Sequence, residues 1–150
     1  MKLILAILIC LLVGFLGSIF TMSAIPTWYA TLNKPFFSPP NWLFAPVWTT
    51  LYILMGISLY LILNKKKVDK TAVMIFVVQL VLNFLWSIMF FGLHSPFLGL
   101  INIILLWLTI VWTIISFMKV SKTAGYLLFP YILWVSFASL LNLAVYLLNK

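Results

Sequence analysis

The sequence predicts an all-α integral membrane protein, a five-transmembrane-helix bundle with a proline- and aromatic-rich lid loop between its first two helices. Two observations carry this prediction. Hydrophobic residues make up 66% of the 150 residues and charged residues only 7%, whereas a typical soluble domain has roughly 45–50% apolar and about 25% charged residues. The apolar residues also gather in five runs, each long enough to cross a bilayer, which takes about 20 residues.

Turn or lysine clusters separate the five apolar runs, so each run is expected to form one transmembrane helix. The expected helices cover 3–25, 45–64, 71–91, 97–118 and 124–148. Five spans of about 20 residues leave room for one long loop and short connections only. The whole chain, 1–150, is therefore predicted to be a single transmembrane domain.

Small residues and prolines set expectations within these helices. Gly14 and Ser18 have the small-xxx-small spacing of close helix packing, either within one chain or between two. Pro46 and Pro96 fall in the first turns of the second and fourth helices, where a missing N–H costs nothing. Pro130 lies inside the fifth expected helix and should kink it.

The charged residues predict the orientation, because cytoplasmic loops of membrane proteins are enriched in positive charge. Nine lysines stand against one acid, Asp69, and there is no arginine. The N-terminal side holds Lys2, Lys65, Lys66, Lys67, Lys70, Lys119 and Lys122, and the other side holds Lys34 and Lys150. We therefore expect the cytoplasmic membrane, with the N-terminus in the cytoplasm and the C-terminus outside. Since these lysines lie between the apolar runs, nucleic acid is not an expected partner.

The longest connection, 26–45, then lies on the outer side. It holds four prolines and six aromatic residues, namely Pro26, Pro35, Pro39, Pro40, Trp28, Tyr29, Phe36, Phe37, Trp42 and Phe44. Prolines stiffen the loop and exposed aromatic side chains are costly, so we favour a lid that folds back over the bundle. The alternative is an aromatic belt that anchors the protein at headgroup depth.

Side chains for acid–base or metal chemistry are scarce in this sequence. The only acid sits in a lysine-rich loop, and no Ser/His/Asp set is present. Hydrolysis and metal catalysis are therefore not expected, and no metal site is predicted. His94, in the turn between the third and fourth helices, is interpreted as a solvated turn residue, with axial contact to a haem-like ligand as the alternative. The lone Cys10 is interpreted as a small apolar filler.

Polar residues inside the spans form stripes. Gln79, Asn83 and Ser87 recur every four residues and share one helix face. The fourth and fifth helices add the polar residues Asn102, Thr109, Thr113, Ser116, Ser139 and Asn142. Amides in hydrocarbon are costly unless paired, so these stripes should face the bundle interior. For any one of these residues, hydrogen bonding between helices is a sufficient explanation.

The depth of these residues nevertheless predicts a pocket. Counting 1.5 Å per residue from the helix ends, the outer half contains Trp48, Asn83, Trp86, Asn102 and Asn142, while Trp107 and Trp134 lie near the middle. Amides and large aromatic planes that converge beneath an aromatic lid are typical of a site for a flat, mostly apolar ligand with a few polar groups.

Three blocks of residues resemble the TspO/MBR family of tryptophan-rich sensory proteins. The loop block reads Trp28-Tyr29-x-x-Leu32-x-Lys34-Pro35-x-Phe37-x-Pro39-Pro40, followed by Phe44, Trp48 and Leu51-Tyr52-x-Leu54-Met55-Gly56. The third helix carries Gln79-x3-Asn83-x2-Trp86-Ser87-x2-Phe90-Phe91, and the fifth carries Pro130-Tyr131-x2-Trp134-x3-Ala138-x2-Leu141-Asn142. The blocks stand in the family's order and spacing across most of the chain.

The resemblance implies a membrane receptor or sensor for porphyrins, such as protoporphyrin IX or haem, that regulates tetrapyrrole metabolism or a stress response. Isoquinoline carboxamides and benzodiazepines are further implied ligands, a homodimer is expected, and no cofactor is required besides the porphyrin bound as ligand. The implied ligand-binding residues are Tyr29, Trp48, Tyr52, Asn83, Trp86, Ser87, Phe90, Trp134, Ala138 and Asn142. Asn83 and Asn142 would supply hydrogen bonds, and Lys34 a charge for a propionate.

Two other functions stay open. One is a light-dependent porphyrin-degrading enzyme, in which the family's implicated tryptophans match Trp48 and Trp134. The other is a tetrapyrrole or sterol transporter, but an odd number of helices without paired inverted repeats argues against it.

The sequence departs from the family pattern at two places. The first loop lacks the acids usual in the family, and Asn102 stands where an acid is common. Residues 143–150 match a sequence pattern of Leu or Val, Tyr and Lys that has been proposed for cholesterol binding. An interfacial Tyr146 and the terminal Lys150 explain this match equally well, so cholesterol is not an expected partner.

Overall fold

The computed structural model describes residues 1–150 and contains helices joined by turns and loops, without strands. The α-helices are α1 (Lys2–Ala24), α2 (Phe44–Leu63), α3 (Lys70–Ser87), α4 (Pro96–Val120), α5 (Lys122–Tyr126) and α6 (Phe129–Asn149). A π-helical turn, η3 (Ile88–Gly92), extends α3, and two short 3-10 turns, η1 (Tyr29–Thr31) and η2 (Asn41–Leu43), lie in the long loop. Five segments are long and apolar enough to cross a membrane, as predicted. The chain is an integral membrane protein.

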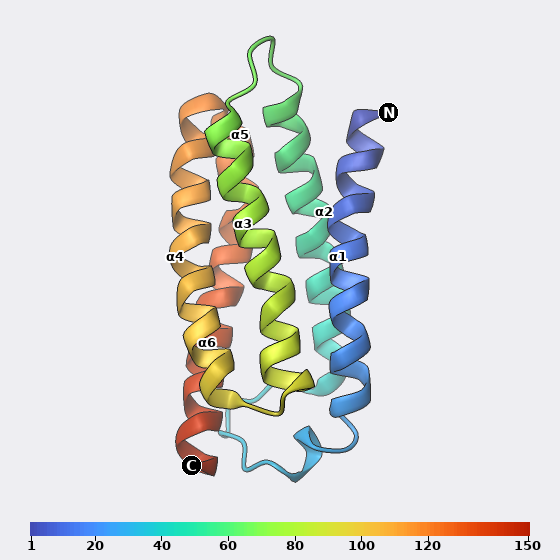
Figure 1. Cartoon of the computed structure of the whole chain (residues 1–150), viewed down its shortest axis with the longest axis vertical. Coiled ribbons are helices and arrows are strands. Elements are labelled where there is room, and N and C mark those ends of the chain that lie inside the picture. The colour runs from blue at the N-terminus through green and yellow to red at the C-terminus, as the bar shows by residue number, and fades with distance from the viewer.

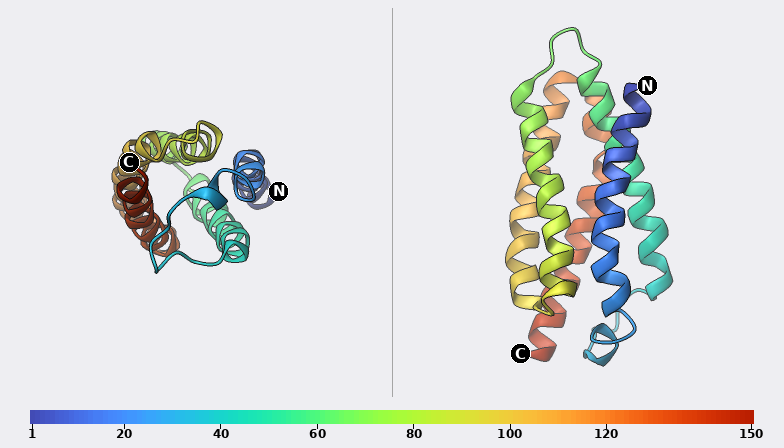
Figure 2. Two further views of the ribbon diagram at one scale, coloured as in Figure 1. Left: turned by 90° about the horizontal axis from the view of Figure 1, so that it is seen from below. Right: turned by 45° about the vertical axis from the view of Figure 1, so that its right-hand side comes forward.

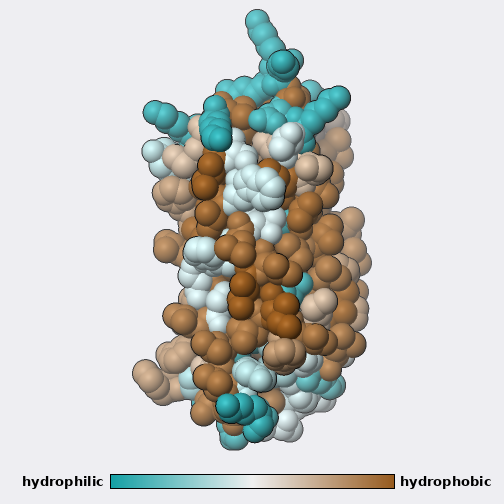
Figure 3. Space-filling view, turned by 60° about the vertical axis from the view of Figure 1, so that its left-hand side comes forward, coloured by the Kyte–Doolittle hydropathy of each residue, from teal (hydrophilic) through white to brown (hydrophobic).

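The helices run up and down in one bundle (Figure 1). The N-terminus shares one end with the connection between α2 and α3, whereas the long first loop, the turn before α4 and the C-terminus share the other end. The lysines at 65–67, 70, 119 and 122 lie in the connections or in the terminal turns of helices at the end of the bundle that holds the N-terminus. Hydrophilic side chains gather at one end of the molecule above a broad hydrophobic belt (Figure 3). The bundle thus separates its charges along its long axis, as the sequence predicts.

Side-chain caps define where several helices begin. The Asp69 carboxylate accepts a hydrogen bond of 3.1 Å from the Ala72 N–H at the start of α3, and Ser95 caps α4 in the same way. Pro96 follows as the first residue of α4, where no N–H donor is needed. The single acid of the chain therefore caps a helix.

The fifth span differs from its prediction. A continuous helix over 124–148, kinked at Pro130, was expected, but α5 ends at Tyr126 and α6 begins at Phe129. Pro130 thus lies in the first turn of α6, and its interpretation as an interior helix residue was wrong. Because Pro130 has no N–H to donate to the Tyr126 carbonyl four residues earlier, and its ring would clash with that carbonyl, α5 ends at Tyr126 and a new helix begins at Phe129.

Glycines let α1 approach its neighbours closely. A Cβ atom added to Gly56 on α2 would lie 2.5 Å from the Ile7 Cα on α1, and Gly14 on α1 packs directly against the Tyr52 ring. Gly17 similarly faces Ser87 on α3. The close packing predicted for Gly14 is therefore confirmed, and it occurs within the chain. Ser18, its predicted partner in the motif, instead lines a cavity.

Candidate functional site

The first half of the long loop turns inward over the end of the bundle (Figure 2, left). Tyr29 is only 3% exposed, and its ring packs against Phe90 and Phe91 with centroids 6.4 and 5.7 Å away. Trp28 packs edge-on against Phe90 at 5.6 Å. Burial raises the pKa of the Tyr29 hydroxyl above its ordinary value, so this residue is a neutral phenol at physiological pH.

Hydrogen bonds hold this half of the loop in place. The backbone of Asn33 exchanges two bonds with the Asn149 side chain at the end of α6, with lengths of 2.9 and 2.8 Å. The Lys34 ammonium donates to the Tyr29 carbonyl at 2.9 Å and lies 4.7 Å from the centre of the Tyr29 ring. The loop is thus tied to the C-terminal helix and to itself.

The second half of the loop carries the most exposed aromatic side chains, although Asn41, Trp42 and Phe44 at its end border the cavity described below. Phe36 is fully exposed, and Trp42 is 72% exposed. The lid prediction therefore describes the segment that contains Trp28 and Tyr29, while the exposed aromatic residues have the positions expected of an interfacial belt.

His94 lies in the exposed turn before α4 with a positive φ of 53°. Its ring stacks on Trp28 with a centroid separation of 4.8 Å and an angle of 7° between the planes. It does not line the cavity described below, which agrees with its interpretation as a solvated turn residue.

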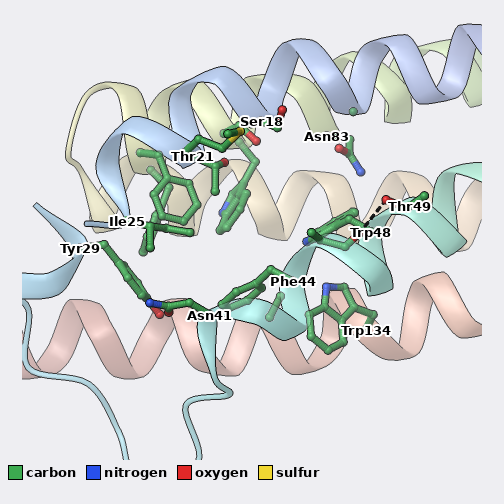
Figure 4. Close-up of a pocket in the computed structure, with 18 of the residues that line it drawn as sticks. Ser18, Thr21, Ile25, Tyr29, Asn41, Phe44, Trp48, Thr49, Asn83 and Trp134 are labelled. Atoms are coloured by element: carbon green, nitrogen blue, oxygen red, sulfur yellow. Dashed lines mark hydrogen bonds between the residues drawn. The ribbon is translucent and has the colours of Figure 1, made fainter. Parts of the chain in front are cut away.

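A cavity of about 730 Å³ lies beneath the lid, between α1, α2, α3 and α6 (Figure 4). Its volume falls within the range of about 300–1,000 Å³ that is typical of small-molecule sites. All ten residues that the sequence implies for ligand binding line it: Tyr29, Trp48, Tyr52, Asn83, Trp86, Ser87, Phe90, Trp134, Ala138 and Asn142. No charged side chain is among the lining residues.

The contribution of α1 to the cavity was not predicted from the sequence. This helix lines the cavity with Leu11, Gly14, Phe15, Ser18, Thr21 and Met22, and Ile25 directly after it is a further lining residue. Thr21 and Ser18 face the cavity in Figure 4. Their polarity within an apolar helix was the available signal, but small residues on one face also suit helix packing, and the sequence does not distinguish the two roles.

Two residues expected in the pocket lie elsewhere. Asn102 donates to the Leu82 carbonyl at 2.8 Å, and the Trp107 indole N–H donates to the Ser136 hydroxyl at 2.8 Å. Neither side chain lines the cavity, so their predicted convergence beneath the lid was wrong. Both belong to α4, which packs against α3 and α6 and contributes no lining residue. Depth along a helix does not tell whether that helix borders the cavity.

The floor of the cavity is a buried chain of hydrogen bonds across three helices. The Tyr52 hydroxyl donates to the side-chain oxygen Oδ1 of Asn83 at 2.5 Å, and the side-chain N–H of Asn83 donates to the Tyr131 hydroxyl at 2.7 Å. The Tyr131 hydroxyl in turn donates to the side-chain oxygen Oε1 of Gln79 at 2.7 Å. The amide of Asn83 thus joins α2 to α6, which is the bonding between helices that the sequence left as an alternative.

The second lining amide is also engaged. The Asn142 carbonyl oxygen accepts from the Trp86 indole N–H at 3.0 Å, and its amide N–H donates to the Pro96 carbonyl at 2.8 Å. Since a side-chain amide group carries two N–H donors, Asn83 and Asn142 each donate one hydrogen bond and have a second N–H without a protein partner.

Aromatic planes form most of the remaining wall. Trp48 packs against Tyr52 and Tyr131 with centroids 5.7 and 6.4 Å away. Trp86 stacks on Phe90 with ring centroids 5.1 Å apart. Trp134, another lining residue, has a buried indole N–H without a hydrogen-bond partner. Flat apolar faces with few polar groups suit a flat, mostly apolar molecule.

The cavity is open on one side. Its lining includes the exposed residues Phe15 and Met22 of α1 and Ala45 and Thr49 of α2. Both helices are membrane-spanning, so this opening faces the hydrocarbon region of the bilayer.

Five spanning helices around a lid-covered, uncharged cavity define the class of the protein, an integral membrane protein with a cavity of small-molecule size inside its helix bundle. Comparison with known families gives the particular family: the TspO/MBR family model matches residues 6–148, and the chain belongs to this family. The resemblance seen in the sequence is thereby confirmed.

Named relatives agree with this assignment. The chain is 51% identical to the tryptophan-rich protein TspO of Archaeoglobus fulgidus, over 99% of this chain and 97% of that protein. It is 49% identical to the protein of the same name from Chlorobaculum tepidum, over 99% and 96% of the two chains. It is also 38% identical to the translocator protein of Bos taurus, over 86% and 79%.

The hydrogen-bond chain predicts a loss of stability on replacing Asn83. Asn83→Leu leaves the Tyr52 hydroxyl without an acceptor and Tyr131 without a donor. We expect the free energy of unfolding to fall by about 1–3 kcal/mol, measured by thermal or denaturant unfolding in detergent. Ser87→Ala is the control, because Ser87 also lines the cavity but makes no side-chain hydrogen bond, and its effect should stay within about 0.5 kcal/mol. Equal losses for both variants would contradict a stabilising role of the chain.

Proposed function

We propose that this chain is a membrane receptor that binds porphyrins, protoporphyrin IX or haem, and related flat hydrophobic ligands in the cavity beneath the lid, and so regulates tetrapyrrole metabolism or a stress response. The observation that carries the proposal is the uncharged cavity of about 730 Å³ with indole faces from α2, α3 and α6. Relatives of this chain are named as sensory and translocator proteins, which supports a receptor role.

The bound macrocycle would lie against Trp48, Trp86 and Trp134. Ring stacking supplies dispersion and burial of apolar surface, which are largest for extended flat ligands. The free N–H groups of Asn83 and Asn142 would meet ligand acceptors. Smaller flat ligands, such as isoquinoline carboxamides, would use the same faces and fill less of the space.

Porphyrin propionates need a cation, and no lining residue supplies one. Lys34 is the nearest candidate in the loop, because its ammonium is held against Tyr29, itself a lining residue. Two of its three N–H groups donate to the Tyr29 and Leu32 carbonyls, so one remains for a carboxylate.

An absorbance titration of the purified protein with protoporphyrin IX tests this function. We expect saturable binding, weakened about two- to fivefold by Lys34→Gln, as for a partly exposed ion pair. The dimethyl ester of protoporphyrin IX should bind wild type and variant alike, because it carries no propionate charge. Failure of protoporphyrin IX to saturate would refute the proposal, and an equal loss for acid and ester would remove Lys34 from it.

The position of two tryptophans favours a second candidate function, light-dependent porphyrin breakdown. Trp48 and Trp134 both line the cavity, from different helices (Figure 4). No thiol lines the site, and indole, unlike the phenols of Tyr29 and Tyr52, can give up an electron without losing a proton at the same time. Either indole would give an electron or a hydrogen atom to a light-excited porphyrin.

Conservative replacement separates the receptor from the photoenzyme. Trp48→Phe and Trp134→Phe keep a stacking face, so we expect each variant to retain most of its porphyrin affinity. If the protein is a photoenzyme, both lose light-dependent consumption of protoporphyrin, followed by absorbance under constant illumination. Trp112→Phe, at an exposed tryptophan of α4 that does not line the cavity, is the control and should leave the consumption of protoporphyrin unchanged. Photobleaching at one rate by wild type, variants and free porphyrin would eliminate the enzyme.

The lysine distribution supports an orientation in the cytoplasmic membrane with the N-terminus in the cytoplasm and the lid outside. A single cysteine replaces Lys66 or Lys34 in a Cys10→Ala background, which removes the only native thiol. In intact cells, an impermeant thiol reagent should label the cysteine at position 34 and label the one at 66 only after lysis. The reverse labelling pattern would contradict this orientation and place the N-terminus outside.

A further inference from the structure

Gln79 presents an unexplained polar group in the centre of the bundle. Its side chain is 1% exposed, and its amide nitrogen has no hydrogen-bond partner, although its carbonyl oxygen accepts from Tyr131. A buried unpaired donor is costly. Gln79 does not line the cavity, but it ends the chain of hydrogen bonds whose other end, Tyr52, does.

The chain has a direction, because each phenol has only one hydrogen to donate. In this structure the hydrogens point from Tyr52 through Asn83 and Tyr131 toward Gln79. The hydrogen of Tyr52 is thereby committed to Asn83, and the Tyr52 oxygen keeps a lone pair. At the cavity floor Tyr52 can therefore accept a hydrogen bond but not donate one.

The reverse direction has the same number of internal bonds. After half-turns of the two amide groups, Gln79 would donate to Tyr131, Tyr131 to Asn83, and Asn83 to Tyr52. Amide oxygen and nitrogen exchange places in such a turn, so no helix has to move. The Gln79 nitrogen gains a partner, its oxygen loses one, and the Tyr52 hydrogen is released toward the cavity. Without an acceptor in the cavity that hydrogen is unpaired, which favours the direction seen here.

We propose that Gln79 is a positioning residue that sets the direction of this chain, and thereby makes the cavity floor at Tyr52 select ligands that donate a hydrogen bond. A ligand with a ring N–H fits the observed direction, whereas a ligand with a ring acceptor must reverse it. The inference rests on the proposed ligand cavity and adds the polarity of the group that Tyr52 contacts. Trp48, which packs on both phenols, holds the two rings in place.

Matched flat probes test the proposal with the full chain in detergent. Carbazole carries a ring N–H and fluorene is its counterpart without one; acridine carries a ring acceptor and anthracene is its counterpart without one. Affinities are measured by quenching of tryptophan fluorescence. We expect wild type to prefer carbazole to fluorene, and the ratio of these affinities removes any general effect on packing.

Gln79→Leu removes the group that accepts the Tyr131 hydrogen. Tyr131 can then donate only to Asn83, so the chain of hydrogen bonds adopts the reversed direction. The carbazole-to-fluorene affinity ratio should fall roughly two- to tenfold, and the acridine-to-anthracene ratio should rise by a similar factor, as expected for one hydrogen bond. Gln79→Met gives the same result with a side chain of similar length, should the leucine variant fold poorly. Gln79→Glu keeps an acceptor for Tyr131 and retains the wild-type ratios.

Two controls confine the effect to the chain. Asn102→Leu removes another buried amide that bonds α4 to α3 outside the chain, so both ratios should stay at wild-type values. Tyr52→Phe removes the hydroxyl at the cavity floor. In a Tyr52→Phe background, Gln79→Leu should therefore no longer change either affinity ratio.

The outcomes separate this inference from the proposed function. Ratios unmoved by both Gln79→Leu and Gln79→Met, or moved equally by Asn102→Leu, overturn the role of Gln79 while the cavity remains a binding site. Failure of all four probes to bind wild type overturns the cavity itself as a ligand site, and this inference with it.

Discussion

Pairing of polar groups inside the hydrocarbon region is the constraint on which the rest of this structure depends. An unpaired amide or hydroxyl is costly there, and water is absent as a partner. The chain meets this constraint with bonds between helices: Asn83 joins α2 to α6 through two tyrosines, and Asn142 joins α6 to α3 through Trp86. Ser58 links α2 to the carbonyl of Ala124 at the start of the fifth span. These bonds fix the rotation of the helices about their axes, which apolar contacts with lipid and with other helices leave nearly free.

The same bonds explain why a cavity survives at the lid end of the bundle. Nearer the N-terminal end, Gly56 lets α2 touch α1 at Ile7, whereas toward the lid large aromatic side chains surround open space. The floor of that space is a fixed polar network and its walls are indole and phenyl faces. The cavity is therefore polar only at a few points, which is the usual composition of a site for a small apolar molecule.

Charge is kept away from the cavity. The lysines lie at the two ends of the bundle, and the single acid, Asp69, caps α3. No cation inside the cavity could pair with a charged group of the proposed ligands, so such a group would have to stay at the lid, where the Lys34 ammonium is held by the Tyr29 carbonyl. For the apolar part of such a ligand, the proposed route would be the opening between α1 and α2.

The fold class, the approximate bounds of the five spans and the separation of charge between the ends could be predicted from the sequence, because each depends on apolar length or lysine placement along the chain. The family resemblance added the ten lining residues. Which further polar residues border the cavity depends on how the helices pack in three dimensions. The tertiary structure placed Asn102 behind α3, brought Ser18 of α1 to the site, and turned Pro130 from a predicted kink into the first turn of α6. It also showed that the amide of Asn83 is shared between two phenols. Periodicity tells which residues share a helix face, but the neighbour that this face meets depends on the order of the helices around the bundle, and that order is set by contacts between residues far apart in the sequence.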